Sequence, residues 1–127
     1  MGYNKSMKYN IVAGEALRKI MINLLDSPIP FNEDMSKGAF HSEPFSEDFI
    51  NERSTVHHVT PSVYKEKLSM FLNILDNISC DDEIDLYFGD DETCIANRSF
   101  LIDYFSNKVK TIKLHIVDEY TGKEKEL

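Results

Sequence analysis

The chain has 127 residues, of which 42% are apolar and 28% are charged, as is typical of a globular domain that buries one core. Its formal net charge is −8, from 22 acidic and 14 basic residues, and no more than two basic residues are adjacent. These values exclude nucleic acids and anionic membrane surfaces as expected partners, because both are bound through a basic face.

The ends of the chain and its cysteines favour a cytoplasmic protein. The N-terminus lacks the apolar stretch of a signal peptide, and no apolar run reaches the roughly 20 residues that cross a bilayer. Cys80 and Cys94 lack metal-ligand spacing, and secreted disulfide scaffolds carry more cysteines, so we expect two reduced thiols. Residues 1–7 are expected to be a disordered start or a cloning remnant, residues 8–118 a single domain and residues 119–127 a frayed polar tail.

Strand and helix patterns alternate in the first third of the chain. Residues 8–12 are β-prone, and the apolar spacing over residues 15–25 predicts an amphipathic helix. Residues 29–31 are short and apolar, and Pro30 favours an edge strand. Residues 32–44 are rich in Asn, Asp, Ser, Gly and Pro and predict a loop.

Helix-start signals mark the middle of the chain. Ser46 and Thr60 are typical N-cap residues, and Thr60 precedes a proline at the first helical position. The helix after Ser46 carries Arg53 on its apolar face. Residues 61–75 have a continuous apolar face and predict one helix.

The last third adds two strands and a helix. Residues 83–89 alternate and carry an extra apolar side chain, which predicts a central strand. The turn 89–92 leads into a helix that begins near Asp91 and runs to Phe105. Residues 111–117 alternate between apolar and polar side chains and predict an edge strand.

This order of elements predicts an α/β fold. Strands that alternate with helices favour parallel pairing through right-handed crossovers. We expect a small open, mostly parallel sheet of about four strands, in the order 2-1-3-4, with helices on both faces, a Rossmann-like architecture. In such sheets ligands bind outside the carboxyl ends of the strands where the winding reverses, here between the first and third strands.

Three acidic, glycine-containing loops meet at this predicted crevice. Carboxylates there are suited to Mg²⁺, Mn²⁺ or Ca²⁺, but near helix starts they also serve as caps and dipole complements. Nucleotide binding is disfavoured, because neither helix start has the spacing of a phosphate-binding loop. The expected ligand-binding residues are Gly14, Glu15, Glu33, Asp34, Arg53, Asp90, Asp91, Cys94 and Asn97.

Four polar side chains have more than one interpretation. Arg53 either extends its head to solvent, pairs with a site carboxylate or holds an anionic group of a ligand. Cys94 is interpreted as a buried structural thiol rather than a nucleophile, because nearby carboxylates raise the pKa of a thiol. His57 and His58 are expected to act as cations at a helix C-terminus rather than as ligands.

Three segments resemble the motifs of one family. Residues 9–17 resemble an "hIVnGDsla" opening, residues 29–38 an acidic "DDLsxG" segment, and residues 83–94 with Asn97 an "EvxLWFgdDlfCqxN" segment. Together they are similar to the bacterial domain of unknown function 1835 family, Bacteroidetes type, over nearly the whole chain. Arg53 matches an arginine of that family. The resemblance implies the fold and the neighbourhood of the site, and no particular reaction.

Two functional hypotheses follow. The first is a small-ligand or metal-assisted site at the carboxyl ends of the first and third strands, where Arg53 anchors an anionic group and Asn97 orients the ligand. The second is a non-catalytic protein-interaction or regulatory module, because Phe40, Phe45 and Phe49 are expected to add exposed apolar surface. Neither hypothesis decides whether the chain is an enzyme.

Overall fold

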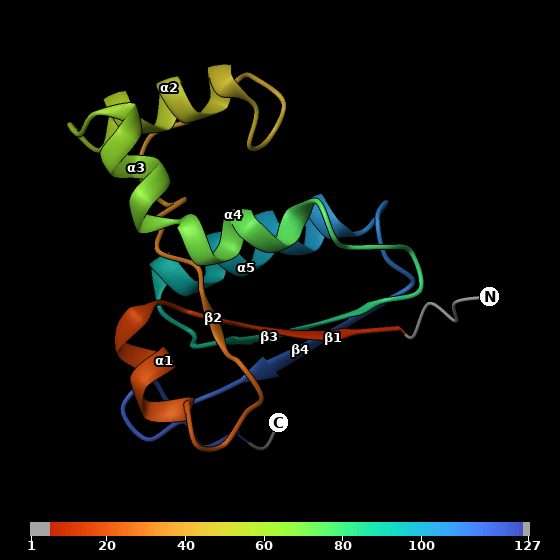
Figure 1. Ribbon diagram of the computed structural model, residues 1–127. Helices are drawn as coiled ribbons and strands as arrows, with labels where there is room; N and C mark the ends of the chain where they lie inside the picture. Colours follow the sequence, from red (N-terminus) through yellow and green to blue (C-terminus); the bar gives the residue numbers. More distant parts are fainter. Residues whose placement is uncertain (1–5, 126–127) are drawn as a thin grey trace.

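Four parallel strands form one open sheet in the computed structural model, which describes residues 6–125 (Figure 1). The strands lie in the order β2-β1-β3-β4, which confirms the predicted α/β class and strand order. They are β1 (Lys8–Val12), β2 (Ile29–Pro30), β3 (Glu83–Phe88) and β4 (Thr111–Ile116).

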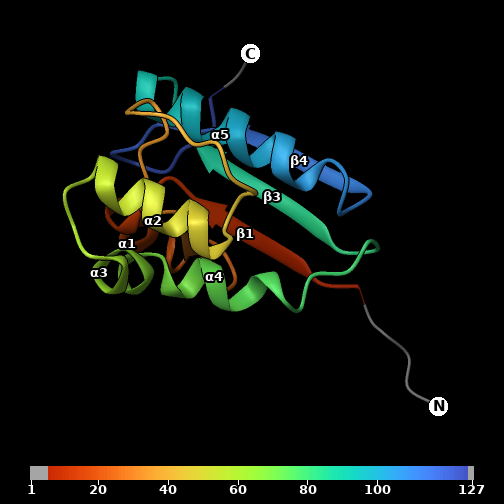
Figure 2. The same ribbon diagram turned by 90° about the horizontal axis from the view of Figure 1, so that it is seen from above.

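Helices cover both faces of the sheet, as expected. In Figure 1, α1 lies on one side, and the other four helices lie on the opposite side; Figure 2 looks down on this larger helical layer. In that layer α5 contacts β3, and α4 contacts β2. The helices are α1 (Glu15–Met21), α2 (Glu47–Val56), α3 (Pro61–Lys67), α4 (Ser69–Leu75) and α5 (Glu92–Phe105).

The pleat of the central strands divides the core in two. Ile84, Leu86 and Phe88 are fully buried under the larger helical layer. Tyr87 points to the opposite face and packs with Val12 and with α1. Because β3 has apolar side chains on both faces, it occupies the predicted central position.

The predicted helix starts are confirmed by their caps. Ser46 Oγ accepts a hydrogen bond from the Phe49 N–H at 3.2 Å, and Thr60 Oγ1 accepts one from the Val63 N–H at 3.2 Å. These side chains satisfy backbone donors that have no partner within the helix.

The first helix is shorter than predicted. It ends at Met21, and the N–H groups of Leu24 and Leu25 both donate to the Met21 carbonyl in a turn. Leu24 is 66% exposed, so a further helical turn would bury little apolar surface. Without that burial a short helix is not extended by propensity alone.

The single helix predicted over residues 61–75 is two helices that meet at Leu68 (Figure 1). Asn32 Nδ2 donates to the Lys67 carbonyl at 3.0 Å. Leu68 leaves helical geometry, with φ −98° and ψ 7°. The Asn32 side chain, from a loop distant in sequence, therefore binds the carbonyl of the last residue of α3, next to the break at Leu68.

The segment after β4 folds back instead of fraying. The Asp118 N–H donates to the Lys123 carbonyl, and the Gly122 N–H donates to the Asp118 carbonyl, both at 2.8 Å. Val117 and Glu124 form an antiparallel bridge. Where a frayed tail is expected, turn hydrogen bonds therefore tie residues 119–125 to β4. Residues 1–5 and 126–127, parts of the predicted start and tail, lie outside the described residues.

Phe40, Phe45 and Phe49 pack together and do not form the exposed apolar surface that the second hypothesis expects. Phe49 is fully buried, and its ring lies 5.3 Å from Phe40 and 5.2 Å from Phe45. The loop before α2 closes over the core because its apolar side chains gain more by burial than by exposure. Within residues 6–125, no helix has both the length and the apolarity to cross a membrane.

Candidate functional site

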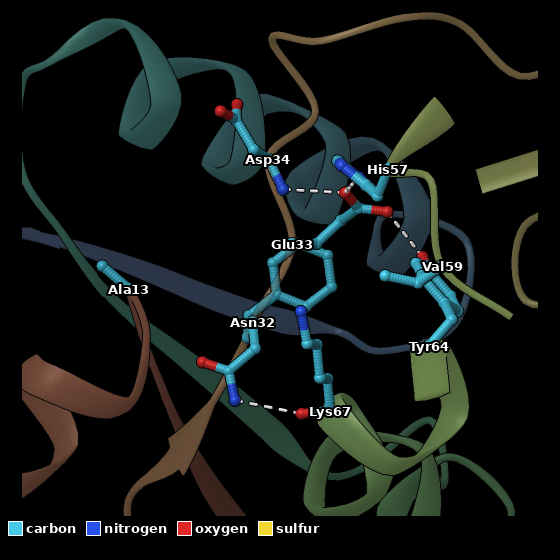
Figure 3. Close-up of a pocket in the computed structure, with 9 residues that line it drawn as sticks. Ala13, Asn32, Glu33, Asp34, His57, Val59, Tyr64 and Lys67 are labelled. Atoms are coloured by element: carbon cyan, nitrogen blue, oxygen red, sulfur yellow. Dashed lines mark hydrogen bonds and ion pairs between the residues drawn. The ribbon is translucent and has the colours of Figure 1, made fainter. Parts of the chain in front are cut away.

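A cavity of about 390 Å³ opens at the carboxyl ends of β1 and β2. We call it the strand-end cavity (Figure 3). Its walls come from the residue after β1, the segment after β2, the end of α2 and helix α3. The lining residues are Ala13, Phe31, Asn32, Glu33, Asp34, His57, Val59, Tyr64 and Lys67.

A buried ion pair lies behind the wall of this cavity. Arg53 Nε donates to Glu33 Oε2 at 2.9 Å, and Arg53 Nη2 donates to Glu33 Oε1 at 3.0 Å. Both side chains have 0% exposure. Arg53 therefore pairs with a site carboxylate, and the interpretation in which its head reaches solvent is wrong, because Glu33 compensates its charge in the interior.

Three further groups bind the same carboxylate. The Tyr64 hydroxyl donates to Oε2 at 2.5 Å, the Asp34 N–H donates to Oε1 at 2.7 Å, and His57 Nε2 contacts Oε1. Burial raises the pKa of Glu33, but the hydrogen bonds from Arg53, Tyr64 and Asp34 outweigh it and hold this pKa below its ordinary value. Glu33 is therefore a fixed carboxylate whose acceptor sites are occupied by the protein.

Asn97 of α5 holds the loop that carries Glu33. Asn97 Nδ2 donates to the Glu33 carbonyl at 2.7 Å, and Asn97 Oδ1 accepts from the Met35 N–H at 2.8 Å. This buried amide donates to one backbone group of the loop and accepts from another, as the backbone of a neighbouring strand would. Asn97 thus positions the loop rather than facing the strand-end cavity, whose lining it does not join.

Asn32 connects this loop to the start of α1. Its Oδ1 accepts from the Glu15 N–H at 3.0 Å, while its Nδ2 holds the Lys67 carbonyl. Gly14 has φ +150°, a conformation that side chains rarely adopt. The Glu15 carboxylate itself pairs with Arg18, at 2.8 and 2.9 Å.

A second group of polar side chains lies at the start of α5 and in the segment after β4. It consists of Asp91, Cys94 and Glu119, and we call it the thiol–carboxylate cluster. One ligand atom from each residue lies within 4.8 Å of the other two. The Cys94 thiol donates to Glu119 Oε1 at 3.1 Å. Burial, with Glu119, raises the pKa of Cys94 to about 12, and the hydrogen bond shared with Asp91 raises the pKa of Glu119. Cys94 is therefore held as a neutral thiol.

The structure separates the predicted site residues into two groups. Glu33, Asp34, Arg53 and Asn97 are joined by hydrogen bonds beside the strand-end cavity, which Glu33 and Asp34 line, and Gly14 and Glu15 are joined to it through Asn32. Asp91 and Cys94 meet at the thiol–carboxylate cluster, and Asp90 pairs with Arg98 at 3.2 Å and Lys125 at 3.5 Å. The loop after β3 contributes no residue to the lining of the strand-end cavity.

Sequence reasoning did not select five residues that complete these groups. His57 was expected to act as a helix-end cation, Tyr64 belonged to a predicted apolar helix face, and Glu119 fell in the predicted tail. Their contacts span 24, 31 and 25 residues of sequence. The five residues are Asn32, His57, Tyr64, Lys67 and Glu119.

Comparison with known proteins finds no relative of this chain. No protein-family model matches the chain, and no curated protein or solved structure matches it.

Proposed function

We propose that this chain binds a small-molecule ligand in the strand-end cavity. The observation that carries the proposal is the fully buried Glu33–Arg53 ion pair behind the cavity wall, with the lining residues His57 and Tyr64 bound to the same carboxylate. Burying two charges costs several kcal/mol per ion, and well-packed apolar residues often stabilise a fold equally well. A buried charged network directly behind a cavity wall is therefore better explained by ligand recognition than by stability.

The size and place of the cavity support the same proposal. Its volume of about 390 Å³ falls within the range of roughly 300–1,000 Å³ that is usual for small-molecule sites. Open parallel sheets bind ligands outside the carboxyl ends of their strands. The proposal places the ligand against β1 and β2, on the side of β1 away from β3.

Some residues of the resembling segments also meet beside this cavity, although the loop after β3 lies elsewhere. Glu33 and Asp34 lie in the second resembling segment, and Asn97, in the third, holds the Glu33 carbonyl. Arg53, the residue that matches the arginine of the family, pairs with Glu33. This convergence supports a proposed membership in the domain of unknown function 1835 family.

Ligand-dependent stabilisation tests the proposal. A ligand present at about 100 times its dissociation constant adds roughly 2.7 kcal/mol to the free energy of unfolding. We expect a shift in thermal unfolding with members of a panel of small polar metabolites, and its loss in His57→Asn. His58→Asn is the matched control, because His58 is exposed and does not line the cavity. A panel without any shift, or an equal shift in both variants, contradicts the proposal.

Divalent-cation binding at the thiol–carboxylate cluster is a second candidate function. The observation that favours it is the approach of three ligand atoms to within 4.8 Å of one another, from the start of α5 and from the segment after β4. A thiolate with two carboxylates suits Zn²⁺ better than Mg²⁺. Calorimetric titration with Zn²⁺ should show binding that Cys94→Ser removes and that Cys80→Ser, at the exposed cysteine, retains. Binding that survives Cys94→Ser contradicts it.

A further inference from the structure

We infer that the ligand of the strand-end cavity carries a single anionic group, a carboxylate or a phosphate, that the cavity binds through Lys67. The inference rests on the proposed function. The sequence-based expectation is different, namely acids that coordinate a cation. The inference depends on which polar groups of the cavity wall have no partner within the protein.

Glu33 has no coordination site left for a cation. Its two oxygens accept four hydrogen bonds, two of them from Arg53, and a fourth residue, His57, contacts Oε1. Arg53 also neutralises its charge at 2.9 Å. A metal ion would have to displace a buried guanidinium that also donates to the Asp34 carbonyl at 2.9 Å. The cost of leaving that guanidinium unpaired makes such a displacement unfavourable.

Asp34, the other acid of the lining, is turned away from the cavity. In Figure 3 its carboxylate points away from that of Glu33. Its Oδ1 accepts from both the backbone N–H and the hydroxyl of Ser36, and Lys37 Nζ lies 4.0 Å from its Oδ2. Glu33 is therefore closed to a ligand, and the Asp34 carboxylate is engaged by Ser36 and Lys37.

Among residues 6–125, the lining offers one ammonium group without an ion-pair partner. Lys67 Nζ makes no ion pair with any residue between 6 and 125, and in Figure 3 the Lys67 side chain points into the cavity. Both polar atoms of the Asn32 side chain have partners: Oδ1 accepts from the Glu15 N–H, and Nδ2 donates to the Lys67 carbonyl. His57 uses Nε2 for Glu33, and its Nδ1 has no hydrogen-bond partner within the described residues.

The ammonium group of Lys67 at the cavity selects an oxyanion. Hydrogen bonds from charged donors to carboxylate or phosphate oxygens are about twice as strong as those between neutral groups. Aromatic and aliphatic side chains of Phe31, Val59 and Ala13 complete the wall, so the rest of the ligand has an apolar contact surface. The net charge of −8 repels polyanions, which favours a ligand with one anionic group.

A set of probes that share one carbon skeleton tests this inference. Benzoate, benzamide and benzylammonium differ mainly in charge, and inorganic phosphate tests the second oxyanion. Binding is followed by NMR chemical shifts of the backbone amides of Asn32, Glu33 and His57 in the full chain. We expect benzoate to bind at least about tenfold more tightly than benzamide, because a charge-assisted contact is lost in the amide.

Two lysines of α3 provide the matched variants. Lys67→Met should weaken benzoate binding at least about tenfold and leave benzamide binding unchanged. Lys65→Met removes the same charge from the same helix, but Lys65 lies outside the cavity and pairs with Glu47 at 3.2 Å, so benzoate binding should be retained. Since both lysines are exposed, neither variant should prevent folding.

The outcomes separate the inference from the proposed function. Equal binding of benzoate and benzamide, tighter binding of benzylammonium, or equal effects of the two lysine variants would overturn the anionic ligand and leave a small-molecule cavity in place. If no probe, phosphate included, shifts these amides, both the ligand class and the proposed function are wrong.

Discussion

Arg53 and Glu33 form a bidentate ion pair in which neither side chain is exposed, and it joins α2 to the segment after β2. Arg53 also donates to the carbonyls of Asp34 and Ala39, at 2.9 and 3.3 Å. One guanidinium therefore satisfies a buried charge and two loop carbonyls. The loop of residues 33–39 depends on this side chain for its conformation.

Replacing Arg53 should destabilise the fold strongly. Arg53→Met leaves the Glu33 carboxylate buried and uncompensated, and such a loss costs about 3–5 kcal/mol of the free energy of unfolding. Urea unfolding measures the change. Arg18→Met is the control, because the Arg18–Glu15 pair lies on the surface of α1 and contributes little. A similar loss in both variants would contradict the structural role of Arg53.

A double variant separates stability from binding. Glu33→Leu with Arg53→Met removes both charges, so no buried charge is left unpaired and most of the lost stability should return. The same variant should not bind ligand in the strand-end cavity, because His57 and Tyr64 lose their common acceptor. A double variant that is no more stable than Arg53→Met argues against the ion pair as the cause of the loss.

Glu33 should also make the fold sensitive to acid. Its pKa in the folded chain lies below the ordinary value of 4.5, because hydrogen bonds outweigh burial. The unfolded chain therefore binds the proton more readily, so the contribution of Glu33 is fully present above pH 4.5 and is lost as the pH falls through the folded-state pKa. Urea midpoints measured on both sides of this window should fall less steeply in Glu33→Gln than in the native chain. Parallel curves for the two proteins would show that other carboxylates carry the acid sensitivity.

Local features of the sequence were sufficient to predict the sheet and the helix starts. β3 and β4 follow from apolar alternation within six residues, and the caps at Ser46 and Thr60 follow from hydrogen bonds that reach three residues along the chain. Parallel order then follows from the alternation of strands and helices, because crossovers are right-handed.

Contacts between distant residues could not be predicted in the same way. The sequence places Arg53 on an apolar face, but several acids are possible partners, and the choice of Glu33 depends on the packing of α2 against the loop after β2. Likewise, the break at Leu68 accompanies the hydrogen bond from Asn32, which lies 35 residues from Lys67. Both features require the folded arrangement, so periodicity and propensity carry no signal for them.

The Tyr64 hydroxyl should contribute to stability through Glu33. Tyr64→Phe removes a donor to a buried carboxylate and should cost about 1.5–3 kcal/mol, the usual range for a hydrogen bond to a charged group. Tyr104→Phe is the control, because the half-buried Tyr104 hydroxyl has no hydrogen-bond partner among residues 6–125. The two free energies of unfolding, from urea titration, should differ by most of that range. Equal values would mean that the short contact of Tyr64 adds no stability.

The two cysteines should differ in reactivity, because Cys80 is exposed and Cys94 is buried beside Glu119. Thiol reagents attack the thiolate, and the pKa of Cys94 is raised to about 12, so Cys94 in the native chain should react far more slowly than Cys80.

Glu119→Ala, measured in a Cys80→Ser background, should accelerate the reaction of Cys94 with an aromatic disulfide. The substitution removes a carboxylate that disfavours the thiolate and uncovers the sulfur. Glu92→Ala is the matched control: it removes the same charge two residues from Cys94, but Glu92 is exposed and makes no contact with the thiol. If both variants react at the native rate, or if Glu92→Ala accelerates the reaction as much as Glu119→Ala, Glu119 does not shield Cys94. A specific effect of Glu119→Ala would establish that the segment after β4 covers the thiol–carboxylate cluster.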